Sequence, residues 1–101
     1  MKINSNHPTI TKANRTYILA RQAYEEAFDK VVDDFSPEIS QDTRKNFQGV
    51  IFTLNSAYQE LSELVREFSP SVKKEVANAV YIRSRMIDIK SWTYLTIEYI
   101  N

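Results

Sequence analysis

Few side chains in this sequence have the types and the spacing that catalysis requires. Histidine occurs once, as His7 in a polar N-terminal stretch, and cysteine does not occur. A lone imidazole has no second base, acid or metal ligand beside it, and zinc sites need further imidazoles or thiolates. The sequence therefore predicts no catalytic residue, no metal site and no cofactor.

Carboxylates are the next group with regular spacing. Glu25, Asp29 and Asp33 recur every four residues, so a helix would carry them on one side. That side points away from the apolar positions Tyr17 and Tyr24, which are expected to face the interior. We therefore predict a solvated surface there, and not a ring of inward carboxylates around a divalent metal.

Two cations occupy an unexpected position. Arg83 and Lys90 are seven residues apart, and they project into the middle of an otherwise apolar stripe of one predicted helix. A buried cation needs a carboxylate partner or an anionic ligand, unless its long stem carries the charge to the rim. The ligand option gives an alternative function, a helical bundle or enzyme that holds an anionic small molecule with these two residues.

Charge and composition exclude several classes of protein. Thirteen Lys+Arg and thirteen Asp+Glu leave the 101 residues without net charge, so no global field attracts nucleic acid or an anionic membrane. The single glycine, Gly49, cannot build a phosphate-binding loop, which needs several glycines. A local excess of positive charge between residues 69 and 91 leaves weak nucleic-acid binding as a third function. Its basic residues are Lys73, Lys74, Arg83, Arg85 and Lys90.

Prolines and helical periodicity divide the chain into three segments. Pro37 and Pro70 each follow a serine, and serine followed by proline is typical of a helix start. Ser40 and Ser71 are alternative caps one turn later. Between these residues the apolar side chains recur in steps of three and four, as on one face of a helix. The spacing predicts helices over about 10–35, 38–68 and 70–99.

The predicted core is one apolar stripe on each helix. On the first helix it consists of Ile10, Ala13, Tyr17, Ala20, Tyr24, Ala27 and Val31. On the second helix it consists of Phe47, Val50, Leu54, Ala57, Leu61, Leu64 and Phe68. On the third helix it consists of Val72, Val76, Ala79, Met86, Ile87, Tyr94 and Ile97, and Ile82, Ile89 and Ile100 extend it to one side.

The predicted helices form one domain over residues 10–101, preceded by a flexible arm over residues 1–9. Short turns between helices of similar length favour an all-α, antiparallel, up-down-up three-helix bundle. A strand over residues 92–100, rich in β-branched and aromatic residues, is the rival interpretation and would need a partner edge from another copy. Because the third helix is apolar on most sides, we expect a homodimer to cover the surplus.

The face of the third helix opposite its core stripe is aromatic. Aromatic residues and arginine dominate the energetics of protein interfaces. We therefore interpret the chain as a non-catalytic protein–protein interaction module of adaptor or inhibitor type, whose partners are a second copy of itself and another protein. The predicted partner-binding residues are Tyr81, Arg85, Trp92, Leu95 and Tyr99, together with Phe52 on the second helix.

The expected location follows from two features of the sequence. The first nine residues lack the apolar run of a secretory signal. No stretch has the roughly 18 to 20 uninterrupted apolar residues that cross a bilayer. We therefore expect a cytoplasmic protein without a membrane partner.

Overall fold

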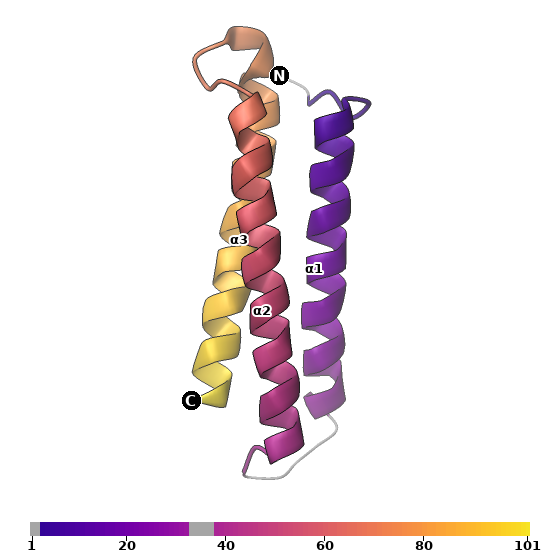
Figure 1. Cartoon of the computed structure of the whole chain (residues 1–101), viewed down its shortest axis with the longest axis vertical. Coiled ribbons are helices and arrows are strands. Elements are labelled where there is room, and N and C mark those ends of the chain that lie inside the picture. The colour runs from indigo at the N-terminus through magenta and orange to yellow at the C-terminus, as the bar shows by residue number, and fades with distance from the viewer. Residues whose placement is uncertain (1–2, 33–37) are drawn as a thin grey trace.

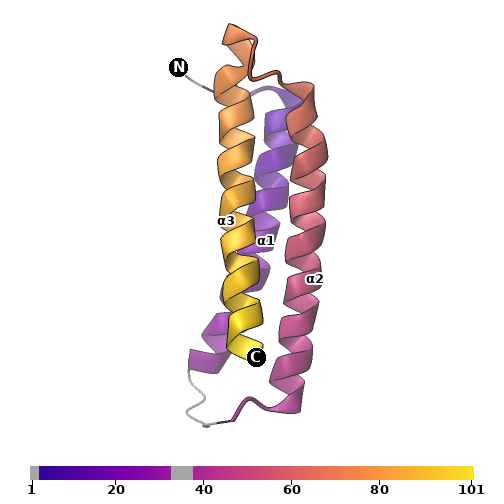
Figure 2. The same ribbon diagram turned by 90° about the vertical axis from the view of Figure 1, so that its left-hand side faces the viewer.

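Three long helices build the molecule (Figures 1 and 2). The computed structural model describes residues 3–32 and 38–101, and that part of the chain contains no β-strand. The helices are α1 (Pro8–Val32), α2 (Gln41–Leu64) and α3 (Val76–Ile100), and they lie along the long axis of a body of 51 × 20 × 18 Å. The prediction of an all-α helical bundle is confirmed. None of the helices in the described ranges combines the length and the apolar character that crossing a membrane requires.

Two short 3-10 helices lie where the chain turns between α2 and α3. The first, η1 (Val65–Glu67), extends α2, and the second, η2 (Lys73–Glu75), leads into α3. In Figure 1 the colour runs down α1, up α2 and down α3. Contacts at the helix ends agree with this course. The Thr9 hydroxyl at the start of α1 donates a hydrogen bond to Glu67, and Arg44 near the start of α2 donates one to the carbonyl of Ile100.

The boundaries of the first two helices differ from the expected ones. The predicted end of the first helix at 33–35, and the Ser36–Pro37 turn that follows it, lie outside the described residues. The second helix begins at Gln41 and not at residue 38. Ser40 is its N-cap, because the Ser40 side chain accepts a hydrogen bond from the backbone N–H of Thr43 at 3.1 Å.

The third helix also begins later than expected. The chain turns after Ser69, whose backbone N–H donates a hydrogen bond to the Glu75 carboxylate at 3.0 Å. This contact closes the turn, and the regular α-helix starts at Val76 and not at residue 70. Residues 92–100 form the last turns of α3, so the strand interpretation of that segment is wrong.

The core stripes expected on the first two helices are buried. On α2, Phe47, Leu54 and Leu61 have no exposed surface. On α1, Ala13 and Ala20 are buried against them, and their small side chains let the two helices approach. Burying one large apolar side chain contributes about 1.5 to 3 kcal/mol, so these positions stabilise the α1–α2 pair.

The third helix presents to the core one edge of its expected stripe, where Ile82, Ile89 and Ile100 are buried. Ile89 and Thr96 are fully buried, whereas Ile87 and Tyr94 of the predicted stripe are exposed. Thr96 is tolerated in the core because its hydroxyl donates a hydrogen bond to the carbonyl of Trp92 at 2.7 Å, which satisfies the buried polar group. The predicted core stripe of this helix is therefore wrong for Ile87 and Tyr94, whereas Ala79 is buried and Met86 packs against the core.

The segment expected to be an N-terminal arm contacts the bundle from Asn4 onward. The backbone N–H of Asn4 donates a hydrogen bond to the side-chain oxygen of the buried Asn78 at 2.8 Å. The His7 ring meets the Phe68 ring edge-on, with centroids 4.9 Å apart. The helix then begins at Pro8, because a proline in the first turn forfeits no helical hydrogen bond.

Candidate functional site

Three large apolar residues line up on the outward side of α3. Val80, Ile87 and Tyr94 are 57%, 66% and 61% exposed. Because they are seven residues apart, they follow one line that is about 21 Å long. We call Val80, Ile87 and Tyr94 the outer row.

Arg83 and Lys90 lie beside the outer row and are exposed. Neither forms an ion pair or a hydrogen bond with any described residue. Of the options that the sequence left open, an internal ion pair is not formed with the described part of the chain, and the helix turns this side outward, which spares two unpaired cations the cost of burial. The two cations within an apolar stripe were themselves the sequence signal for this orientation.

Trp92 and Tyr99, both predicted to face a partner, pack against other parts of the same chain. The Trp92 ring stacks on Tyr24 with centroids 5.4 Å apart and an interplanar angle of 15°. The Tyr99 ring lies 5.4 Å from Phe28 and 5.1 Å from Phe47. The premise that this face of α3 lacks an intramolecular partner is therefore wrong.

Tyr81 and Arg85 lie in the same interface between α1 and α3. The Arg85 guanidinium lies 4.4 Å from the centroid of the Tyr17 ring and 4.9 Å from that of the Tyr81 ring. The Asp88 carboxylate lies 3.7 Å from this guanidinium and accepts a hydrogen bond from the Tyr17 hydroxyl at 3.1 Å. Cation–π contacts of this kind contribute about 0.5 to 2 kcal/mol. We define the aromatic seam as Tyr17, Tyr24, Tyr81, Arg85 and Trp92.

Burial changes the acid–base properties of the aromatic seam. Burial raises the pKa of Tyr17 above its usual value, and the hydrogen bond to Asp88 raises it further. Burial also raises the pKa of Tyr24. Burial alone would lower the pKa of Arg85, but its interactions with Tyr81, Tyr17 and Asp88 raise that pKa overall. The seam therefore favours the neutral forms of Tyr17 and Tyr24 beside a charged Arg85.

Leu95 and Phe52 are the other two predicted partner-binding residues, and both are exposed. They lie on different helices, α3 and α2. Polar side chains, including Asn55 and Gln59, line the surface hollow beside Phe52. Isolated exposed apolar residues are common on folded proteins, so these two do not define a site by themselves.

The basic residues considered for nucleic-acid binding do not share one surface. Lys73 and Lys74 lie in η2, while Arg83 and Lys90 lie beside the outer row. Arg85 is held within the aromatic seam. The five cations therefore lie in three different places on the protein.

The carboxylates of α1 lie at the surface. Glu25 and Asp29 are exposed, and Glu25 forms an ion pair with Arg21 at 3.7 Å. Asp33 lies outside the described residues. The predicted solvated surface is confirmed for Glu25 and Asp29. Across the described ranges, no three His, Cys, Asp or Glu side chains gather as metal ligands would.

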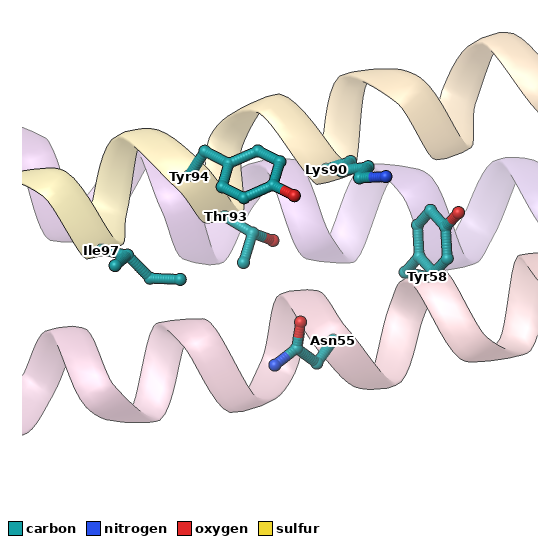
Figure 3. A pocket seen from close by; sticks show the side chains of 6 residues that line it. All are labelled: Asn55, Tyr58, Lys90, Thr93, Tyr94 and Ile97. Carbon is teal, nitrogen blue, oxygen red and sulfur yellow. The ribbon is translucent and has the colours of Figure 1, made fainter.

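A groove of about 310 Å³ lies between α2 and α3 (Figure 3). In Figure 3 the Lys90 ammonium and the Tyr94 hydroxyl point toward Tyr58, and Ile97 lies at the other end. Sequence analysis missed this groove, because its α2 residues showed no unusual spacing. We call it the α2–α3 groove, and its lining residues are Asn55, Tyr58, Lys90, Thr93, Tyr94 and Ile97.

Comparison with known proteins assigns no function. No protein-family model matches the chain, no curated protein matches it, and no solved structure matches it. The functional argument therefore rests on the outer row and on the α2–α3 groove.

Proposed function

We propose that this protein is a non-catalytic interaction module that binds a helix along the outer row of α3. We propose further that α3 of a second copy occupies the row and makes the protein a homodimer. The observation that supports this function is the exposure of Val80, Ile87 and Tyr94 on one line. A coiled-coil seam has two apolar positions in every seven residues, and the outer row supplies one of them. The bundle core uses the opposite side of α3, so this row is left for a second helix.

Two charges beside the outer row, Arg83 and Glu98, suit an antiparallel pair of α3 helices, and their attraction has to outweigh the repulsion between the two Lys90 side chains next to the two-fold axis. Arg83 and Glu98 are both exposed, and neither forms an ion pair with a described residue. In a pair whose two-fold axis lies midway between these positions, Arg83 faces Glu98 of the partner subunit. The same register sets Ile87 opposite Tyr94 of the partner subunit. Symmetry repeats each contact, so one register supplies two ion pairs and two apolar pairs.

A helix of another protein is the second occupant that we propose for the outer row, in competition with the second copy. Arg83 and Lys90 would favour acidic residues on that helix, because charge complementarity across an interface selects the partner. We also propose a cytoplasmic location, with which a chain without cysteine is compatible.

Sedimentation velocity over a concentration series tests the proposed assembly. The wild type is expected to shift from monomer to dimer as its concentration rises. Ile87→Ser removes the apolar side chain at the middle of the row and is expected to shift the midpoint to at least about tenfold higher concentration. Leu19→Ser changes an apolar residue of α1 that is 58% exposed, and this matched control should sediment as the wild type does. A monomeric wild type at every concentration would contradict the proposal.

Charge exchange tests the antiparallel register. Arg83→Glu and Glu98→Arg should each weaken the dimer several-fold, since each replaces two attractive pairs by repulsive ones of up to about 1 kcal/mol apiece. The double variant restores opposite charges across the interface and should recover most of the wild-type affinity. If the double variant is as weak as the sum of the single variants, the two residues do not face each other.

A further inference from the structure

The α2–α3 groove has polar groups without partners along its length. Lys90, Tyr58, Tyr94 and Asn55 all lie along it (Figure 3). None of these four side chains forms a hydrogen bond or an ion pair with a described residue. Thr93 is different, because its hydroxyl donates to the carbonyl of Ile89 at 2.9 Å. The groove therefore offers one ammonium and several neutral donors to whatever enters it.

The other surfaces of the groove are apolar or aromatic. The Tyr94 ring forms one wall, and Ile97 lies at the end away from Lys90 (Figure 3). A planar ring packs favourably against a tyrosine face in an offset or edge-on arrangement. The volume of about 310 Å³ is near the lower limit of about 300 Å³ for small-molecule sites, which restricts the occupant to roughly one ring with a short substituent.

The charge of the groove selects a monoanion. Among the described residues, Lys90 is the only cation that lines the groove, and Arg83 does not line it. Both walls are interior turns of long helices, whose backbone N–H groups are already bonded within the helix, so the groove lacks the free backbone donors that phosphate sites use. A carboxylate needs fewer donors, and one ammonium with tyrosine hydroxyls and an amide N–H provides them.

We propose that the α2–α3 groove is a binding site for a small aryl carboxylate. The carboxylate contacts Lys90, with the Tyr94 hydroxyl and the Asn55 amide as further donors. The aromatic ring lies against Tyr94 and extends toward Ile97. This inference goes beyond the proposed interaction function, because Tyr94 is the residue of the outer row that also lines the groove, and Val80 and Ile87 do not line it.

The proposal is tested by titrating phenylacetate into the isotope-labelled full chain. The NMR chemical shifts of the backbone amides report where the probe binds and how tightly. We expect shifts that saturate in the millimolar range and are concentrated at the lining residues of α2 and α3. Phenylacetamide has the same shape without the charge, and acetate has the charge without the ring. Each should bind at least about tenfold more weakly than phenylacetate, because the amide lacks the contact with the Lys90 charge and acetate lacks the contact with the Tyr94 ring.

Two variants with the same change of charge decide whether Lys90 is the anion-binding residue. Lys90→Met should weaken phenylacetate binding about tenfold. Arg83→Met removes a cation from the same side of α3 but outside the groove, and should bind phenylacetate as the wild type does. Asn55→Ala should weaken binding two- to fivefold.

Three results would overturn the site. These are equal affinities for phenylacetate and its amide, shifts centred elsewhere on the surface, and unchanged binding by Lys90→Met. The titration is repeated with Ile87→Ser, which lies outside the groove lining. If Ile87→Ser still binds phenylacetate but sediments differently from the wild type, ligand binding in the groove and the proposed dimer are distinguishable.

Discussion

Trp92 fills the space between two tyrosines of α1, at ring centroid distances of 5.4 Å from both Tyr17 and Tyr24. Its position was inferred from sequence as an outward one, because it projects opposite to the most apolar stripe of its helix. Sequence alone cannot reveal that α1 presents two tyrosines at the matching height. Aromatic side chains at an intramolecular contact and at a docking face look the same in one sequence.

Truncation of this indole should change stability and leave assembly unchanged. We expect Trp92→Ala to lower the free energy of unfolding by about 2 to 4 kcal/mol, because it leaves a cavity beside Tyr17 and Tyr24. Urea denaturation followed by circular dichroism measures the loss. Leu95→Ala, three residues away and 51% exposed, should cost less than about 0.5 kcal/mol. A weaker dimer with an unchanged urea midpoint would contradict the assignment of Trp92 to the fold.

The seam tyrosines predict a loss of stability at alkaline pH. The pKa of Tyr17 is raised in the folded chain from 10.0, so the unfolded chain releases this proton first. The contribution of Tyr17 to the free energy of unfolding is complete below about pH 10 and is lost as the pH rises through the pKa of Tyr17 in the folded chain. Urea midpoints measured from about pH 9 upward should fall less steeply for Tyr17→Phe than for the wild type. Parallel curves would show that Tyr17 does not contribute to the alkaline transition.

At the scale of the helix, the three segments were not equally predictable. The stripe of α2 follows from its sequence, because the apolar residues from Phe47 to Leu64 occupy one side and polar residues the other. α3 has apolar residues in several directions, so periodicity alone does not choose which side is buried. Contacts with the neighbouring helices decide which side of α3 is buried. Trp92 packs against the seam tyrosines, whereas Arg83 and Lys90 remain exposed to water.

Gly49 provides a test of α2 as an element. It lies within the helix, and a Cβ added to it would meet nothing within 4 Å. Gly49→Ala should therefore raise the free energy of unfolding by about 1 kcal/mol, since alanine loses less backbone entropy on forming a helix. Thermal or urea denaturation measures the gain. Gln48→Ala, at the exposed neighbouring position, should change stability by less than about 0.5 kcal/mol, and an unchanged or lower midpoint for Gly49→Ala would refute the argument.

At the scale of the whole molecule, contacts between distant segments fix the ends of the bundle. The class of fold could be predicted because it depends on local periodicity and helix length. The contacts of Asn4 with Asn78 and of Arg44 with Ile100 could not, because they join segments whose proximity exists only after folding. The α2–α3 groove was missed for the same reason, since two helices supply its walls.

Asn78→Ala tests the contact that holds the N-terminal segment. The variant leaves the backbone N–H of Asn4 without its acceptor and removes a buried side chain. We expect a loss of about 1 to 3 kcal/mol in the free energy of unfolding, together with faster amide exchange at Asn4. Asn14→Ala is the control, because the hydrogen bond it removes, to Tyr81, is exposed. Unchanged exchange at Asn4 would show that the segment is held by other contacts.

Tyr94 belongs both to the outer row and to the α2–α3 groove, whereas Ile87 belongs only to the row and Asn55 only to the groove. A substitution at Tyr94 must therefore disturb both surfaces together, and its phenotype in a cell would be ambiguous. Separation-of-function alleles have to be made at the unshared positions. An Ile87 allele and an Asn55 allele that complement each other within mixed oligomers would assign the two surfaces to distinct tasks.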